Sequence, residues 1–225
     1  MRSALLCLLP MALVAGCSQP SPADPVVETA PDLEPSSQTM SVSTELAKGE
    51  PRVTRVKLNT TKGDVVIDVH HDWAPIGAEH FLKLVKEGFY EDVKFFRVVP
   101  NFMVQVGMNG DPEVHAKWRD QTIQDEPTKK SNEPGMVTFA KTGAPNSRST
   151  QFFINTGSNG FLDNQGFAPF GEVVEGMDVV ESINDEYGER PDQMMIIRKG
   201  NEYLNEKFPN LDGIKSIEIV GETEA

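Results

Sequence analysis

Residues 55–70, RVKLNTTKGDVVIDVH, alternate apolar and polar side chains on both sides of a turn that contains Gly63. Alternation with a period of two places successive side chains on opposite faces of a strand, so this segment predicts a β-hairpin with one buried face. The side chains expected on that face are Val56, Leu58, Val65, Ile67 and Val69. A folded region that begins with such a hairpin is constrained towards a mainly antiparallel β fold.

The rest of the chain continues this pattern of short apolar runs between glycines and prolines. Helical spacing of apolar residues appears at 74–89, where Pro75 stands at the start and Gly88 at the end, and again at 176–186. A third, short amphipathic helix is expected through Tyr203, Leu204 and Phe208. Further strands are expected at 95–107, 135–142, 151–157, 167–174 and 214–220. Many short strands with two main helices predict a closed antiparallel sheet with helices at its ends.

The N-terminus reads as a targeting segment. A basic Arg2 precedes the apolar run at 4–16, whose 13 residues are too few to span about 30 Å of hydrocarbon as a helix. The run ends in LVAGC, which resembles the lipobox of bacterial lipoproteins. On this interpretation residues 1–16 are a signal peptide, and Cys17 becomes the N-terminus and carries fatty acids such as palmitate. The alternative is a coincidental apolar start with a stray cysteine.

Residues 17–51 follow as the lipidated cysteine and a tether rich in proline, serine and acidic residues, which lacks aromatic side chains and cannot bury enough surface to fold. Ser18, rather than an aspartate, follows the cysteine and favours the outer membrane. The predicted location is therefore the bacterial cell envelope, with the domain facing the periplasm. Residues 52–221 are the predicted folded domain, with an insertion at about 185–213.

Charge and cysteine content exclude several classes of function. The net charge of −13 opposes binding to the phosphates of nucleic acids. The two cysteines, Cys7 and Cys17, both lie in the N-terminal segment, so no disulfide or cysteine metal site is expected in the domain. The four histidines have no known metal-ligand spacing, and no metal or other cofactor is predicted. Asp120, Asp125 and Glu126 are expected in a solvated loop.

The segment 95–105, FFRVVPNFMVQ, poses a more specific question. Two apolar runs, which are separated by Pro100 and Asn101, each carry one polar side chain, Arg97 in the first and Gln105 in the second. Considered alone, the pattern fits an ordinary pair of strands that point both polar groups to solvent. The other hypothesis is that the guanidinium and the amide share a groove and perform chemistry there.

Longer motifs favour the second hypothesis. FFRVVPNFMVQVG, STQFFINTG and FLDNQGFAPFGEVVEGMDVVESI together closely resemble the cyclophilin family of peptidyl-prolyl cis/trans isomerases, in the family's order and from about residue 53 to 220. The resemblance implies a closed eight-stranded antiparallel β-barrel capped by two α-helices. It also implies a groove on the outer face of the barrel that binds Xaa-Pro peptides.

Carried over to this sequence, the resemblance assigns catalysis to Arg97 and Gln105. The substrate-binding residues that it implies are Phe102, Met103, Ala140, Gln151, Phe153, Phe161, Leu162 and Phe167. Four places depart from the usual family pattern. Asn101 stands in place of a glycine. Phe161 stands in place of a tryptophan that contributes to cyclosporin binding, and Phe167 is the nearest match to a histidine of the family. Lys141 and Thr142 stand where many members have an asparagine, and a backbone N–H there is expected to hold the substrate.

The expected function is a peptidyl-prolyl isomerase that acts, as a monomer, on proline-containing peptides and unfolded proteins of the envelope, and that is held to the membrane by lipid on Cys17. Two alternatives remain open. The same fold would serve as a peptide-binding scaffold or holdase with little turnover, or as a structural lipoprotein of the envelope. Arg97 favours the enzyme over the scaffold, because a scaffold has no need of that guanidinium.

Overall fold

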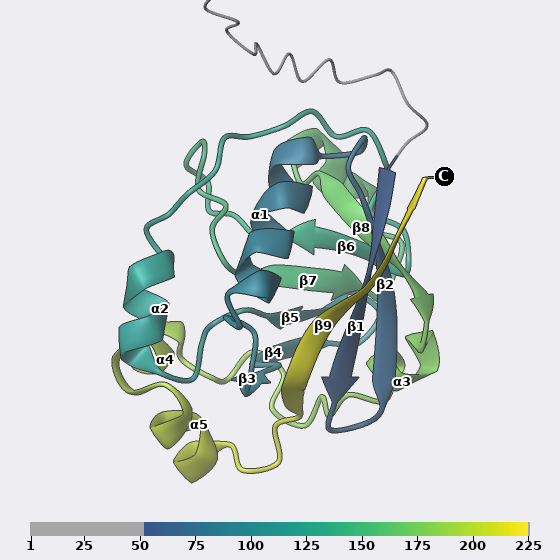
Figure 1. The fold of residues 1–225 in the computed structure, drawn as a ribbon. Helices are drawn as coiled ribbons and strands as arrows, with labels where there is room; N and C mark the ends of the chain where they lie inside the picture. Colours follow the sequence, from purple (N-terminus) through teal and green to yellow (C-terminus); the bar gives the residue numbers. More distant parts are fainter. Residues whose placement is uncertain (1–51, 225) are drawn as a thin grey trace, which may run out of the picture. The chain divides into compact units, whose positions relative to one another are not determined.

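The structure, a computed structural model, describes residues 52–224. Over these residues, nine strands form one antiparallel sheet that curls into an incomplete barrel, and five α-helices and one 3₁₀ helix surround it (Figure 1). The mainly β, antiparallel prediction is therefore confirmed. The predicted signal peptide, the lipid site at Cys17 and the tether up to residue 51 lie outside the described residues.

The strands and helices alternate along the chain without repeating a unit. The strands are β1 (Arg52–Thr60), β2 (Asp64–His70), β3 (Val93–Lys94), β4 (Arg97–Val99), β5 (Met103–Val106), β6 (Met136–Phe139), β7 (Phe152–Asn155), β8 (Pro169–Glu175) and β9 (Gly213–Glu224). The helices are α1 (Pro75–Lys86), α2 (Pro112–Trp118), the 3₁₀ helix η1 (Gly160–Gln165), α3 (Met177–Glu181), α4 (Gln193–Lys199) and α5 (Asn201–Lys207).

Residues 52–224 form nine strands in an incomplete barrel and five α-helices, rather than the predicted eight closed strands and two helices. The strand order shows why the sheet does not close. The order is β3-β9-β1-β2-β8-β6-β7-β5-β4, and the two edge strands are consecutive in the chain, separated only by Phe95 and Phe96. β3 pairs with β9, and β4 pairs with β5. Phe95 packs in the main core whereas Phe96 packs in a separate cluster, so the chain leaves β9 here and crosses to β5 as two short strands.

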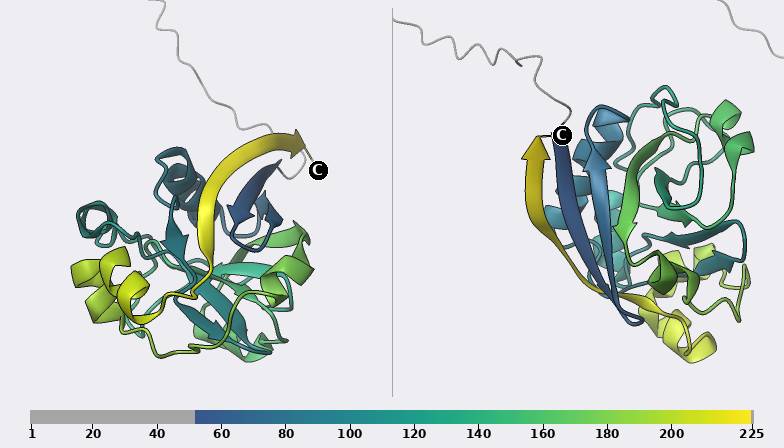
Figure 2. Two further views of the ribbon diagram at one scale, coloured as in Figure 1. Left: turned by 90° about the horizontal axis from the view of Figure 1, so that it is seen from below. Right: turned by 90° about the vertical axis from the view of Figure 1, so that its right-hand side faces the viewer.

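The predicted hairpin is β1 and β2, and its apolar side chains lie in the core as expected. Val56, Leu58, Val65, Ile67 and Val69 are all buried. β9 covers the other side of β1 and bends strongly along its length (Figure 2). Its register shifts against β1 between Arg55 and Val56 and again between Asn59 and Thr60, and such bulges increase the bend of a strand.

The helices differ more from expectation. α1 is confirmed, with Pro75 in its first turn and its buried face on the sheet. The helix predicted at 176–186 contracts to α3, and neither α2 nor α4 was predicted. α2, α4 and α5 lie together on one side of the sheet and α3 lies on the opposite side (Figure 1).

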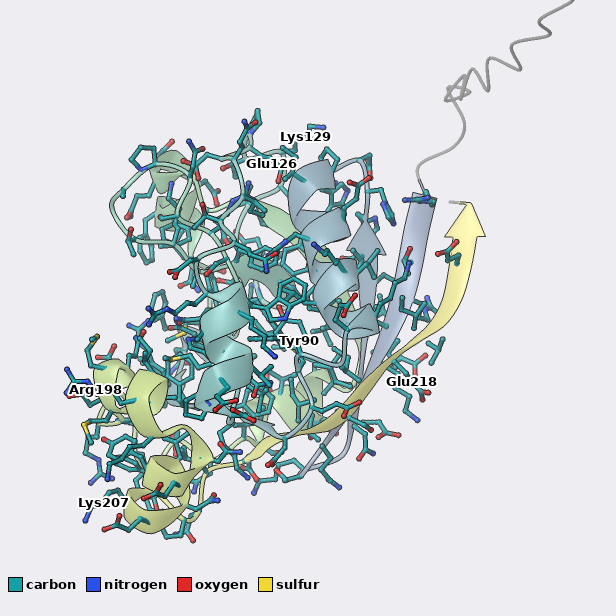
Figure 3. The ribbon with its side chains drawn as sticks, turned by 60° about the vertical axis from the view of Figure 1, so that its left-hand side comes forward. Tyr90, Glu126, Lys129, Arg198, Lys207 and Glu218 are labelled. Atoms are coloured by element: carbon teal, nitrogen blue, oxygen red, sulfur yellow. The ribbon has the colours of Figure 1, made fainter. Side chains whose placement is uncertain are left out.

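The segment 185–213 folds against the sheet and contains the short helix α5 that was expected. Tyr187, Ile196, Leu204 and Leu211 bury their side chains with Phe96 in a cluster of their own. The charged ends Arg198 and Lys207 point outwards from α4 and α5 (Figure 3). Among the described residues, no helix is long and apolar enough to cross a membrane.

Candidate functional site

The strands β4, β5 and β7 place the two polar residues of the 95–105 segment side by side. Arg97 pairs with Gln105 across β4 and β5, and Gln105 pairs with Phe153 across β5 and β7. Their alternating neighbours Val104 and Phe152 point to the opposite face and are buried in the main core. The sheet therefore separates core residues from a set of side chains that share its outer face.

A cavity of about 630 Å³ lies on this outer face. It contains both predicted catalytic residues, and most of the predicted binding residues line it. From the predicted set it is lined by Arg97, Phe102, Met103, Gln105, Ala140, Gln151, Phe153, Leu162 and Phe167. Residues from the strands β4, β5 and β7, from η1 and from the adjoining loops thus converge on one hollow large enough for a short peptide segment.

The apolar part of the cavity is a cluster distinct from the barrel core. Met103, Phe153 and Leu162 are buried and contact one another, and Phe102, Ala140, Phe167 and Val99 pack around them. The Phe153 and Phe167 rings meet edge to face at 5.9 Å between centroids. We call this cluster the apolar cup. Hydrophobic periodicity alone assigns such residues to a core, and the structure assigns them to the wall of a cavity.

Phe161 is the one predicted binding residue that does not line the cavity. Its side chain is 58% exposed, and its ring stacks on Phe102 at 6.1 Å between centroids. It is the second residue of η1, directly before Leu162, whose side chain is buried. Phe161 therefore covers the outside of the cup rather than lining it.

The polar part of the site is a chain of three side chains. Arg97 Nη1 donates to Gln105 Oε1 (3.1 Å), and Gln105 Nε2 donates to Gln151 Oε1 (2.8 Å). The guanidinium carbon also lies 5.8 Å from the centroid of the Phe102 ring. Gln105 thus faces the guanidinium with its oxygen and Gln151 with its nitrogen, which fixes the orientation of its amide.

Sequence reasoning missed one direct partner of the arginine. Arg97 Nε donates to Glu189 Oε1 (2.7 Å), and Nη2 of the same guanidinium forms an ion pair with that oxygen. Glu189 lies 92 residues further along the chain. Nothing in the local sequence distinguishes it from the other acidic residues of the segment 185–213.

A buried amide network beneath the cup was also missed. Asn159 Nδ2 donates to the carbonyls of Phe102 (2.7 Å) and of the Asn155 side chain (2.7 Å). Asn132 Nδ2 donates to Asp163 Oδ1 (2.7 Å) and to the Phe167 carbonyl (2.9 Å). The network holds the loops that carry Phe102, Leu162 and Phe167 in place, since buried amides require such partners. Hydrogen bonding to Ser131 and Asn132 lowers the pKa of Asp163 despite its partial burial.

Two further details explain departures noted in the sequence. Asn101 has φ of +57°, a left-handed conformation that glycine and asparagine tolerate best, so Asn101 can replace a glycine there.

In the loop after β6, the Thr142 N–H donates to Ser147 Oγ (3.0 Å). The neighbouring N–H of Lys141 is consequently the better candidate for the backbone group that holds a substrate.

The second wall of the cavity comes from α2 and α4. From α2 and the residues after it, His115, Arg119 and Asp120 line the cavity, and α4 contributes Gln193, Met194 and Ile197. Burial, together with the nearby Arg119, lowers the pKa of His115 below its ordinary value of 6.5. The imidazole is therefore neutral at any pH above 6.5. The segment 185–213 therefore reaches the site from two places, through Glu189 and through α4.

Within residues 52–224, no group of three or more His, Cys, Asp or Glu side chains is arranged to hold a metal ion. Around Arg97 the cavity combines a guanidinium, the amides of Gln105 and Gln151, and the apolar cup. Such a set can bind a ring and donate hydrogen bonds next to it.

Comparison with known proteins agrees on one family. Residues 55–201 match the family model described as cyclophilin-type peptidyl-prolyl cis-trans isomerase/CLD. A peptidyl-prolyl cis-trans isomerase of Acinetobacter baylyi is 38% identical over 135 residues, covering 58% of this chain and 71% of that protein. Peptidyl-prolyl cis-trans isomerase B of Escherichia coli is 38% identical over 136 residues, covering 57% and 82%. A cyclophilin crystal structure from Hirschia baltica shares the fold with a TM-score of 0.56 at 21% identity, covering 76% of this chain and 77% of that one.

Proposed function

This chain belongs to the cyclophilin-type peptidyl-prolyl cis-trans isomerases, and from that premise we propose that Arg97 catalyses the rotation by donating a hydrogen bond to the prolyl nitrogen. The observation that carries this proposal is the position of Arg97. Its guanidinium lines the same cavity as the apolar cup and is oriented there by Gln105. A proline ring seated in the cup would bring its nitrogen towards these donors.

The reaction makes one chemical demand on the site. Rotation about an amide must overcome a barrier of about 18–20 kcal/mol because resonance across the C–N bond is lost. In the twisted transition state the prolyl nitrogen becomes pyramidal and gains a localised lone pair. A donor aimed at that lone pair stabilises the transition state and barely affects the planar ground state, and this difference accelerates the reaction.

The apolar cup explains how a substrate would be held without being trapped. Burial of a ring of this size contributes roughly 1.5–3 kcal/mol, which favours modest affinity and rapid release. Met103, Phe153 and Leu162 would contact the pyrrolidine ring, and Gln151 with the Lys141 N–H would hold the residues that precede the proline. Gln105 acts mainly on Arg97.

We expect the full chain to accelerate isomerisation of a short Ala-Pro peptide, with kcat/KM independent of pH between about pH 7 and pH 9, because neither guanidinium nor amide groups titrate there. His115, which also lines the cavity, is neutral over this range since burial lowers its pKa. The measurement is the relaxation rate of the peptide by NMR exchange at several pH values.

Two results would count against the mechanism. A slope or a bell-shaped profile in that range would indicate a titrating catalytic group instead of the arginine. Absence of turnover in a folded protein that still binds the peptide would favour the scaffold or holdase. The departures at Lys141 and Phe167 would then be the first residues to examine.

We further propose that this enzyme acts, as a monomer, on proline-containing segments of unfolded proteins in a bacterial envelope, and that lipid on Cys17 holds it at the outer membrane. The LVAGC motif supports this, and so does the tether composition of residues 18–51. The Cys17→Ser variant is expected to move from the membrane fraction to the soluble fraction with unchanged isomerase activity. A variant that stays in the membrane fraction, or a wild-type protein whose mass shows no added acyl chains, would refute the anchor.

A further inference from the structure

We propose that Glu189 is a positioning residue for the catalytic arginine, supplied by the segment 185–213. This inference rests on the proposed role of Arg97. Arg97 Nε donates to Glu189 Oε1 at 2.7 Å, and Nη2 pairs with the same oxygen. A guanidinium has five N–H groups in a rigid plane. Glu189 and Gln105 together engage three of them, and the Nη1 group also contacts Met103 Sδ of the apolar cup.

Glu189 approaches the guanidinium from outside the catalytic cavity. Arg97 lines that cavity, whereas Glu189 lines a neighbouring hollow with Val98, Val99 and Gly188. The carboxylate therefore holds the edge formed by Nε and Nη2 from behind, while Gln105 holds Nη1 from the strand. With both contacts made, the plane of the guanidinium is fixed, and its Nη1 lies 4.0 Å from Met103 Sδ in the cup.

The loop that carries Glu189 is built to hold it there. The Gly188 carbonyl accepts from the Val98 N–H (3.2 Å), so a backbone hydrogen bond joins the loop to the edge strand β4. Next to it, Tyr187 is buried and its ring meets Phe208 edge to face at 5.1 Å between centroids. Arg190 closes the loop by donating to the Tyr187 carbonyl (3.2 Å) and the Glu186 carbonyl (2.8 Å).

A carboxylate beside a catalytic cation has two opposing effects. It fixes the guanidinium, which favours the reaction, and it neutralises part of the positive charge felt by the prolyl nitrogen, which opposes it. The Glu189 side chain is 61% exposed, so water and salt screen its field at the cavity. The hydrogen bond to Nε acts at direct contact and is not screened in this way. Orientation therefore outweighs neutralisation.

The test compares two variants of the full chain in the peptide isomerisation assay. Glu189→Ala removes the acceptor and is expected to lower kcat by about fivefold to tenfold with KM changed less than about twofold, as for loss of orientation in the transition state. Glu189→Gln keeps an acceptor oxygen without the charge and is expected to retain more than half of kcat. Glu186→Gln removes a charge from the same loop, where Glu186 Oε2 contacts Asn210 and not Arg97, and serves as the matched control.

A double variant shows whether Glu189 acts through Arg97. In an Arg97→Lys background, Glu189→Ala is expected to cause no further loss, because lysine lacks the Nε edge that the carboxylate holds. The NMR signal of the Arg97 Nε–H gives a readout that does not depend on activity. Its exchange with water should be about tenfold faster in Glu189→Ala than in wild type, with Glu189→Gln in between.

Three results would overturn the inference. They are an unchanged or raised kcat in Glu189→Ala, an equal loss in the Arg97→Lys background, and an unchanged Nε–H exchange rate. Failure of the arginine mechanism is recognised separately, because Arg97→Ala would then retain turnover whatever the exchange rate shows.

Discussion

Replacement of Arg97 by alanine is expected to lower kcat/KM by about 10²–10³-fold, the loss that follows removal of one preorganised donor from a transition state, or about 2.7–4 kcal/mol. The truncated side chain leaves Gln105 and Glu189 without their common partner, but Glu189 is exposed, and Gln105, although buried, lines the cavity, where water can take the place of the guanidinium. The free energy of unfolding should therefore change little. The measurement is peptide isomerisation beside a urea titration of the same protein.

Two controls sharpen this prediction. Arg97→Lys keeps a positive charge but not the planar fork, so it should recover only a small part of the activity if geometry matters. Arg55→Ala removes an arginine from β1 that does not line the cavity and whose Nε pairs with Asp68 Oδ1 at 2.7 Å. This variant should leave kcat/KM unchanged. Turnover in Arg97→Ala within about threefold of wild type would exclude the arginine mechanism.

Short-range sequence patterns predicted the part of the site that lies on strands. Arg97 and Gln105 each interrupt an apolar run, and the alternation of side chains along a strand places both on the face opposite Val98 and Val104. Whether that face meets solvent or forms a groove depends on what covers it. Here the covering residues, Leu162 and Phe167, arrive from a loop more than 50 residues later, and only the resemblance to a family indicated them.

The sequence contains local signals for α2 and α4 that apolar spacing does not reveal. Asp111 stands before Pro112, and its side chain accepts from the N–H groups of Glu113 and Val114, a standard N-cap followed by proline in the first turn. Asp192 caps α4 in the same way. Both helices are only seven residues long, too short for an apolar period to stand out, so capping residues were the informative signal.

Long-range polar contacts were beyond such reasoning. Glu189 and Glu126 look like ordinary acidic loop residues in the sequence, and Glu126 was expected in a solvated loop. That expectation was wrong. The Glu126 carboxylate is buried against Arg148, whose side chain is 1% exposed, and a pair of this kind depends on the complete fold.

Loss of the Glu126 carboxylate is expected to have the largest effect on stability among the single changes considered, with Glu126→Ala lowering the free energy of unfolding by about 3–5 kcal/mol. Glu126 accepts from the N–H groups of Ile76 (2.7 Å) and Gly77 (2.9 Å) at the start of α1, and from Arg148 Nη1 (3.0 Å). It lies beside that end of the helix (Figure 3). Truncation would leave two helix N–H groups without an acceptor, and it would leave the buried guanidinium with only the Gln124 carbonyl and the more distant Asp125 carboxylate. Urea unfolding monitored by tryptophan fluorescence measures the change.

A double variant tests the cause of this loss. Burial makes a lone charge costly, so Glu126→Leu combined with Arg148→Met should be less destabilised than Glu126→Ala alone, since no unpaired charge remains inside. Glu126→Gln should fall between wild type and Glu126→Ala, because its oxygen can still accept from one N–H of α1. The exposed pair of Arg55 and Asp68 provides the comparison, and Arg55→Ala should leave the midpoint nearly unchanged. If Glu126→Ala unfolds at the wild-type midpoint, then α1 and Arg148 do not depend on this carboxylate, and the end of the barrel is held by packing alone.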